Sequence, residues 1–412
     1  MTQRTGKALG TAALIVAVVA LCVAVFAVLY KKQVSSVNDS LADQAALFTR
    51  LTGLNEPAAR NALDARYVDS DGDLVADAPA EPAKQIDPPT LVFSYVVVED
   101  DAGFRAAFKE LMEAIGTATG KPVEYVSYSS LDDKLRALRD GQLHIAGLNT
   151  GSVPIGVCTA GFVPVSQLGD ASGNAGYRLQ IISPADSKLT KLTDLRGREL
   201  TLTEPSSNSG YKAPLVLLRE NNLRPPTDYL LRYSQGHSQS IAGIKNKLFE
   251  AAAVAGDVLQ REQNEGRIAA TDYKVLYTSD QLFPGAALGY TSTLKPELAA
   301  KIRQVLVSFD WKGTGLEKQF AAEGKTKFVP ADYRKNWEYV RRIDESIGFN
   351  YALRAPATQP TTQTASAPRH VPRIVDFTRL ALDQRPRPIT MSAIFKNRPS
   401  PLLPNPYWLF LY

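Results

Sequence analysis

The chain has 412 residues, of which 44% are hydrophobic, enough for two or three domains with a substantial core. Its formal net charge of +5 equals that of residues 361–412 alone, which hold seven Lys/Arg and two Asp, so the remainder is balanced and has no basic face for nucleic acid. Two cysteines and three histidines without metal-ligand spacing exclude a disulfide framework and a zinc signature.

The N-terminal segment 1–32 contains an uncharged apolar run of 23 residues, 8–30. At a helical rise of about 1.5 Å per residue, this run is long enough to cross the ~30 Å hydrocarbon layer of a membrane. It continues directly into two lysines without small-residue cleavage chemistry, which favours an uncleaved membrane anchor over a secretory signal peptide. The alternative is a lipoprotein signal that ends at Cys22, although Leu21 stands where a small residue is expected.

Residues 33–89 are predicted to form a stalk or a solvated linker after this anchor. The segment contains carboxylates at every second position around Gly72. Oxygen ligands spaced in this way can converge on a calcium ion, because Ca²⁺ takes about six to eight oxygens and a glycine lets the loop wrap around it. Two interpretations remain, an acidic linker or a calcium site formed by Asp69, Asp71, Asp73 and Asp77.

Residues 90–350 alternate short β-rich apolar runs with amphipathic helical stretches, which is typical of an α/β fold. The expected strands are 91–98, 123–128, 145–148, 179–182, 199–202, 230–233, 251–255 and 275–277. The expected helices are 103–115, 130–140, 210–220 and 240–249. Residues 351–412 are rich in proline and basic residues, a composition that cannot bury enough apolar surface to fold alone, so we expect a disordered tail.

Three segments place hydroxyl or amide side chains directly before a predicted helix. Unpaired backbone N–H groups and the helix dipole favour a negative ligand at such a position. The first segment, 204–211, follows a predicted strand, and its Ser207, Asn208 and Ser209 can each donate a hydrogen bond to an oxyanion. Gly210 allows close backbone approach. The plain alternative is an N-capping loop without a ligand.

The other two segments carry weaker signals. In 236–240, His237 precedes an amphipathic helix and can donate a ring N–H, or serve only as a capping or surface residue. In 149–152, Thr150 follows a predicted strand, and Pro154 lies near the first turn of the next helix, where proline is tolerated. Together the three segments predict a site for a small oxyanion.

The order of short motifs along the chain resembles that of a known family. These motifs are Gly176-Tyr177, Asp194-Leu195-Arg196-Gly197, Ser207-Asn208-Ser209-Gly210-Tyr211, Gly236-His237 and Phe283-Pro284-Gly285. Over about residues 90–320 the chain is similar to the phosphate/phosphite/phosphonate-binding proteins of ABC transporters, the PhnD-like family. The resemblance implies a type II periplasmic-binding fold with a hinge, in which lobe one is about 90–177 and 278–320 and lobe two about 178–277.

The resemblance also assigns roles to single residues. Ser207 and Asn208 match the family's phosphonate donors, and His237 matches its ligand histidine. Asp257 lies near an acidic residue that faces the amine of aminoalkylphosphonates. The chain departs from the family where acidic or aromatic residues are replaced by Leu131, Leu148, His144 and Ala286. These departures argue against aminoethylphosphonate and leave phosphate, phosphite or a simple phosphonate as the ligand.

The resemblance therefore predicts an extracytoplasmic solute-binding protein, tethered by its N-terminal helix in the periplasm, with an ABC transporter permease as its partner. We expect no catalytic residue and no cofactor apart from calcium in the linker, because the sequence has neither a Gly-x-Ser-x-Gly nucleophile motif nor a metal cluster to activate water. The alternatives are a membrane-anchored sensor of the same oxyanions and, less favoured, an enzyme with His237 as general base.

Overall fold

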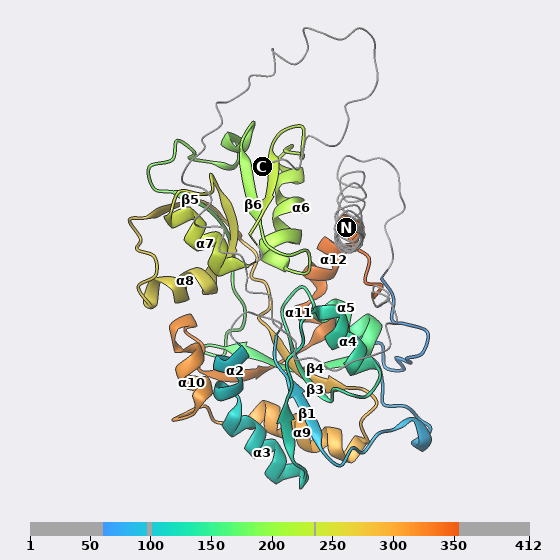
Figure 1. Cartoon of the computed structure of the whole chain (residues 1–412). Helices are drawn as coiled ribbons and strands as arrows, with labels where there is room; N and C mark the ends of the chain where they lie inside the picture. The colour runs from blue at the N-terminus through green and yellow to red at the C-terminus, as the bar shows by residue number, and fades with distance from the viewer. Residues whose placement is uncertain (1–60, 97–100, 235, 354–412) are drawn as a thin grey trace, which may run out of the picture. The chain divides into compact units, whose positions relative to one another are not determined.

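The computed structural model describes residues 61–96, 101–234 and 236–353, and their strands form two sheets (Figure 1). The first sheet has the strand order β11-β4-β10-β3-β1-β2. Its strands are β1 (Leu91–Ser94), β2 (Val123–Tyr125), β3 (Ile145–Leu148), β4 (Phe162–Gly169), β10 (Ala287–Thr291) and β11 (Lys327–Pro330). The second sheet has the order β7-β6-β8-β5-β9. Its strands are β5 (Leu179–Pro184), β6 (Glu199–Leu202), β7 (Leu230–Tyr233), β8 (Ala252–Ala255) and β9 (Tyr273–Thr278).

Both sheets mix parallel and antiparallel pairs. In the first sheet β1 is parallel to β2 and β3, whereas β10 is antiparallel to β3 and β4. In the second sheet β6 is parallel to β7 and β8, whereas β5 is antiparallel to β8 and β9. Because the carboxyl ends of parallel strands lie at the same edge of a sheet, the loops after β6, β7 and β8 come together, and ligands of α/β proteins bind at such an edge.

Helices cover the faces of both sheets (Figure 1). Those in the half built on the first sheet are α2 (Asp101–Ala107), α3 (Lys109–Thr119), α4 (Leu131–Arg139), α5 (Val153–Ala160), α9 (Pro296–Ser308) and α10 (Gly315–Phe320). Those in the half built on the second are α6 (Ala213–Glu220), α7 (His237–Lys245) and α8 (Gly256–Asn264). After β11 the chain forms α11 (Tyr333–Asn336) and α12 (Glu338–Ser346). Three short 3-10 helices are η1 (Pro82–Lys84), η2 (Leu192–Leu195) and η4 (Ala321–Glu323), and η3 (Asn208–Lys212) is a short π-helix.

Helix α4 shows how local sequence sets these elements. Ser130 caps its N-terminus, since the Ser130 side chain accepts a hydrogen bond from the Asp133 N–H and so satisfies one of the unpaired donors of the first turn. Leu135 and Leu138 are three residues apart and point into the core, where both are fully buried. Asp133 on the polar face is exposed, whereas Lys134 is fully buried and its Nζ donates to Gly147 O at 2.8 Å, so α4 also directs one basic side chain inward.

Apolar side chains form three clusters, each of which belongs to particular sheet faces. One packs the first sheet against α3 and α9, with Phe93 and Ile302 among its members. A second packs the other sheet against α7 and α8 through Ile182 and Ile244. The largest joins α4, α5, α6 and α12, so helices from both halves share one core. Burial of apolar area at roughly 25 cal/mol per Å² makes these clusters the main stabilising contribution.

Two extended segments connect the sheets and pair with each other. One runs from β4 to β5 and the other from β9 to β10. They meet at an antiparallel bridge between Tyr177 and Phe283, in which Tyr177 N donates to Phe283 O (2.9 Å) and Phe283 N donates to Tyr177 O (2.8 Å). This pairing is the structural counterpart of the two-strand hinge that the resemblance implied.

The α/β prediction is confirmed, with differences at three places. All eight expected strands occur, three of them (145–148, 199–202 and 230–233) with the expected bounds and five with shifted ends. Strands β4, β10 and β11 were missed; β4 contains Pro164 and β10 contains Gly289, residue types that are uncommon inside strands. The expected helix 103–115 is two helices, α2 and α3. The segment expected to start a regular helix at Gly210 begins instead with the π-helix η3.

The expected membrane segment 8–30 and the expected tail 351–412 lie outside the described residues, apart from 351–353. Among the helices that the structure describes, none has the length and apolarity needed to cross a membrane.

Candidate functional site

The strongest anion-binding segment follows strand β6 and leads into η3. Ser207 is the N-cap, and its Oγ accepts a hydrogen bond from Gly210 N at 3.1 Å. The π-type bonding is visible where Lys212 N donates to Ser207 O at 3.2 Å. π-Bulges are rare and occur often at functional sites. The start of this helix directs unpaired backbone N–H groups and the positive end of the helix dipole toward a ligand position.

Two side chains at the start of η3 are buried without a regular hydrogen-bond partner in the described part of the chain. They are Asn208, whose amide oxygen and nitrogen both lack one, and Ser209, whose hydroxyl lacks one. Asn208 is 2% exposed and Ser209 is fully buried. Leaving such groups unsatisfied costs about 1 to 3 kcal/mol each, so native proteins rarely do so without a reason. A bound ligand with hydrogen-bonding oxygens would remove this cost.

Histidine 237 lies beside this segment as the first residue of α7. Its Nδ1 accepts a hydrogen bond from Ala255 N at 3.2 Å, so the neutral ring carries its proton on Nε2. Nε2 is 3.3 Å from Ser207 Oγ. Burial, helped by the charge of Arg261, lowers the pKa of His237 to about 4. The ring is therefore a neutral N–H donor near pH 7.

Close packing brings these groups together from two loops. A Cβ on Gly210 would overlap the Thr203 hydroxyl and lie 2.9 Å from His237 Cε1. A Cβ on Gly151, in the loop after β3, would overlap Ser206 O and lie 2.9 Å from Asn208 N. Both glycines are needed because no side chain fits at these contacts. The loop 149–152 of the first sheet therefore touches the loop of η3 on the second.

Thr150 and Tyr177 complete the group. The Thr150 hydroxyl donates to Pro284 O at 2.7 Å, so it offers a ligand its oxygen lone pairs and not its hydrogen. Burial raises the pKa of the Tyr177 phenol, while hydrogen bonding by the side chains of Ser209, Thr150 and Asn208 lowers it. The phenol thus lies within reach of these groups, although its contacts with Asn208 and Ser209 fall short of regular hydrogen-bond geometry. We call Ser207, Asn208, Ser209, His237 and Tyr177 the cradle.

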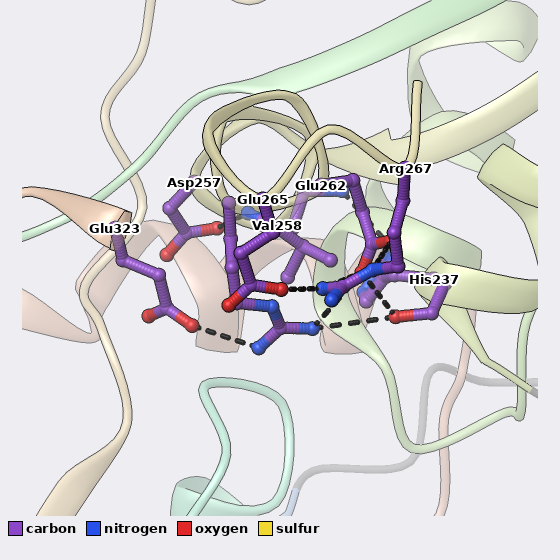
Figure 2. A network of polar contacts seen from close by, with 10 residues as sticks. His237, Asp257, Val258, Glu262, Glu265, Arg267 and Glu323 are labelled. Carbon is purple, nitrogen blue, oxygen red and sulfur yellow. Dashed lines mark hydrogen bonds and ion pairs between the residues drawn. The ribbon is translucent and has the colours of Figure 1, made fainter. Parts of the chain in front are cut away.

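Asp257 lies apart from the cradle donors, in the first turn of α8, where its carboxylate accepts a hydrogen bond from Val258 N at 2.9 Å. Figure 2 shows it next to Glu323, which comes from η4 in the other half of the structure. Arg261 joins the halves, since its guanidinium lies 2.8 Å from the Glu323 carboxylate and donates to Ser238 Oγ at 3.3 Å. Glu262 accepts from Ser238 Oγ at 2.9 Å and pairs with Arg267. We call Asp257, Ser238, Arg261, Glu262, Arg267 and Glu323 the acidic network.

The carboxyl groups around the cradle resist ionisation. Burial raises the pKa of Glu323 to about 7, with a further contribution from the charge of Asp257. Burial also raises the pKa of Asp257, and the charge of Lys325 works against it. Glu204, in the cradle loop, has its pKa raised by burial to about 7. Glu323 and Glu204 can therefore accept or release protons near neutral pH.

The expected calcium loop is formed in part. Carboxylate oxygens of Asp69, Asp71 and Asp73 lie within 4.8 Å of one another. Asp77 lies outside this group, and its Oδ2 accepts a hydrogen bond from Ser70 N at 2.8 Å. Asp69 likewise accepts from Gly72 N at 2.8 Å. The loop's own N–H groups occupy these oxygens, and calcium binding by the loop stays a prediction.

The residues that depart from the family have structural roles. His144 Nδ1 accepts a hydrogen bond from Val92 N at 2.8 Å, and Leu148 is buried in the core. Sequence reasoning named Tyr177 only as part of a motif and did not include Glu323. The motif Gly176-Tyr177 was a usable signal for the first. No sequence signal marked Glu323, because Glu323 lies near Asp257 only in the tertiary fold.

Comparisons with known proteins agree with this geometry. A family model described as ABC transporter, phosphonate, periplasmic substrate-binding protein matches residues 93–337, more than half of the chain. A binding protein component of an ABC phosphonate transporter from Pseudomonas aeruginosa has 21% identity and a TM-score of 0.53, over 64% of this chain and 90% of that one.

Two further solved structures share the fold. PhnD1 from Prochlorococcus marinus, in complex with methylphosphonate, has 13% identity and a TM-score of 0.55, over 63% of this chain and 99% of that one. XAC2383 from Xanthomonas citri, bound to chloride, has 18% identity and a TM-score of 0.54, again over 63% and 99%. Proteins of the matched family bind solutes for ABC transporters, are not enzymes and need no cofactor. The chain belongs to the family of periplasmic substrate-binding proteins of phosphonate ABC transporters.

Proposed function

We propose that this chain captures phosphate, phosphite or a simple phosphonate and passes it to the permease of its transporter. The observation that carries the proposal is the buried amide of Asn208 and the buried hydroxyl of Ser209, which have no regular hydrogen-bond partner in the described part of the chain and follow Ser207, whose Oγ lies 3.3 Å from the neutral His237 ring. A tetrahedral oxyanion offers an oxygen to each of these donors, and hydrogen bonds to a charged group are the strong ones. The cradle therefore suits an anion better than an apolar or cationic ligand.

Four cradle side chains and Thr150 have a role in this proposal. Ser207 accepts from Gly210 N and keeps its O–H for the ligand, and His237 donates from Nε2. Asn208 and Ser209 donate from their unsatisfied groups. Thr150 accepts from a protonated ligand oxygen, because its own hydrogen is held by Pro284 O. Sulfate has no proton near pH 7, so an acceptor at this place selects for phosphorus oxyanions.

Asp257 and Glu323 would face the part of the ligand that the donors do not hold. A carboxylate beside a dianion is unfavourable unless one of the two groups is protonated, and the raised pKa values of both carboxyls allow this. The proposed site thus accepts an anion that carries a proton on one oxygen.

The same proposal includes the organisation of the chain. The segment 8–30 would anchor the protein to the membrane, and the domain 90–350 would close on its ligand as two lobes, one on each sheet. The apolar length of the segment and the distribution of strands between the sheets support these two points.

Calorimetric titration of the full-length chain tests the function. The titrants are phosphate, phosphite, methylphosphonate, aminoethylphosphonate and sulfate, against the wild type and a Ser207→Ala/His237→Ala double variant. Loss of two hydrogen bonds to a charged ligand should weaken binding of the preferred phosphorus oxyanion by about 100-fold or more.

Ser183→Ala is the matched control, because it removes another buried hydroxyl without a partner, on β5 and outside the cradle. It should bind as the wild type does. Absence of heat with all five anions, or equal binding by the double variant, would contradict the proposal.

A further inference from the structure

Lys212 is the last residue of η3, and its side chain is completely buried. Its Nζ donates to Gly151 O at 2.9 Å, in the loop that touches the cradle from the first sheet. The same Nζ lies 3.0 Å from Asp344 Oδ1 and 4.0 Å from the ring centroid of Phe349. Lys212 therefore contacts two parts of the chain that are far apart in sequence, the loop at Gly151 and the segment from Asp344 to Phe349, and it does so from the helix that carries the cradle.

The burial of this charge is compensated only by the groups it contacts. Burial lowers the pKa of Lys212 and the charge of Asp344 raises it, while burial raises the pKa of Asp344 and Lys212 lowers it. Tyr351 supports the pair, since its hydroxyl donates to Asp344 Oδ2 at 2.6 Å. A buried ion pair contributes little net stability, because removing both charges from water costs free energy. Its strict geometry nevertheless fixes how the surrounding helices and loops are arranged.

The neighbouring carbonyl of this loop, Thr150 O, also accepts a hydrogen bond from a buried side chain. Trp337 is fully buried and donates from Nε1 to Thr150 O at 3.0 Å. Two successive carbonyls of one cradle loop are thus held by Lys212 and Trp337. Residues 337–351, which we call the strap, also contact α6, where Arg219 donates to Ser346 O at 2.7 Å. The strap therefore touches both halves of the site region.

Most of the strap lies beyond the part of the chain that the family model covers. That match ends at residue 337, so Asp344 and Tyr351 are outside it. The end of the strap is bound to the start of the described chain. Asn61 Nδ2 donates to Phe349 O at 2.6 Å, and Tyr351 N donates to Asn61 Oδ1 at 3.1 Å. The strap is thus fixed at its far end to the segment that follows residue 60.

We propose that the strap holds the loop 149–152 against η3, and that Lys212 and Asp344 are positioning residues that set how fast a bound anion leaves. Neither residue touches the ligand. Lys212 fixes the last turn of the cradle helix to the opposite loop, and Asp344 fixes Lys212. The proposal deepens the proposed function and rests on it, since the effect on ligand release requires that the cradle binds an anion.

Stopped-flow fluorescence with methylphosphonate, or with the preferred anion from the titration, tests ligand release in the full-length chain. Lys212→Met and Asp344→Asn should each raise the dissociation rate constant about tenfold, the effect of losing one hydrogen bond to a charged group, and change the association rate constant less than about threefold. Lys247→Met, which breaks the exposed pair with Asp186, is the matched control and should release ligand as the wild type does. A purely structural role would lower the melting temperature and leave the release rate of the folded protein unchanged.

Hydrogen exchange of the ligand-free chain separates this inference from the proposed function. Lys212→Met should speed exchange in the peptide that covers residues 149–153, whether or not any anion binds. If Lys212→Met fails to fold, Tyr351→Phe removes only one hydrogen bond to Asp344 and should give a smaller change in the same direction. Unchanged exchange in 149–153 together with a wild-type release rate, in a folded variant, overturns the proposal.

Discussion

The cradle and the acidic network lie at the same edge of the second sheet but treat polar groups in opposite ways. In the cradle, the buried amide of Asn208 and hydroxyl of Ser209 have no regular partner in the described part of the chain. In the acidic network, Arg261 bridges to Glu323 and Ser238, and Glu262 is paired with Arg267. Buried hydroxyls without a partner also occur elsewhere in the described residues, as at Ser183, so what distinguishes the cradle is that such groups gather at the start of η3, where Ser207 Oγ lies 3.3 Å from His237 Nε2.

The two regions also respond to protons in opposite directions. The cradle histidine has a pKa below its usual value, and the carboxyl of Glu323 has one above it. Burial is the first cause in both cases, because it disfavours whichever form is charged. The cradle histidine is thus a neutral donor near pH 7, while Glu323 in the network changes charge near that pH.

Replacing the cradle amide should produce the largest effect. Asn208→Leu keeps the side-chain size but removes the donor, so anion affinity should fall about 100-fold, whereas the free energy of unfolding should stay equal or rise by about 1 kcal/mol because an unsatisfied polar group is lost. Calorimetry and urea unfolding measure the two quantities. Retained binding with a clear loss of stability would show that the amide is structural.

The network should destabilise the fold as pH rises. Since the pKa of Glu323 is about 7 in the fold against 4.5 in the unfolded chain, its contribution is fully present below about pH 4.5 and is lost as pH rises through 7. The free energy of unfolding of the wild type should therefore fall between pH 5 and pH 8, and Glu323→Gln should make this fall about 1 to 3 kcal/mol smaller. Chemical unfolding at both pH values measures this change in the free energy of unfolding. Glu297→Gln, on the exposed side of α9, is the control. If the free energy of unfolding of Glu323→Gln fell with pH as steeply as that of the wild type, the raised pKa of Glu323 would be contradicted.

The cradle histidine should act in the other direction. With a pKa of about 4 in the fold against 6.5 in the unfolded chain, His237 contributes stability that is fully present above about pH 6.5 and is lost as pH falls toward 4. His237→Gln should remove about 1 to 2 kcal/mol of the decline between pH 8 and pH 5. Unfolding curves at these two pH values measure this difference. A His237→Gln variant whose free energy of unfolding falls as steeply as that of the wild type would contradict a neutral ring at His237.

A smaller change should follow at the border between the two regions. Asp257 forms no ion pair among the described residues, although the charges of Lys325 and Arg261 act on its carboxyl. In the proposed function Asp257 faces the ligand, where its ionised form would repel a bound anion. Asp257→Asn should tighten methylphosphonate binding about threefold through removed repulsion and weaken aminoethylphosphonate relative to it. Competition titrations of the two ligands measure the ratio, and an unchanged ratio would place Asp257 outside the ligand's reach.

The sequence predicted the parts of the site that depend on local chemistry. Ser207, Asn208, Ser209 and His237 stand at helix starts, and that position is readable from residue type and strand order. The α/β class followed from the alternation of strands and helices. The sequence could not predict contacts that only the tertiary fold creates. Glu323 meets Asp257, and Lys212 meets Asp344, across 66 and 132 residues of chain, and no local pattern marks either pair.

A crystal structure of the chain grown with methylphosphonate tests the central claim most directly. We predict phosphonate oxygens within hydrogen-bond distance, about 2.7 to 3.2 Å, of Asn208 Nδ2, Ser209 Oγ and His237 Nε2, with Ser207 Oγ turned toward the ligand. A ligand bound elsewhere, with the Asn208 amide and Ser209 hydroxyl still without partners, would contradict the account.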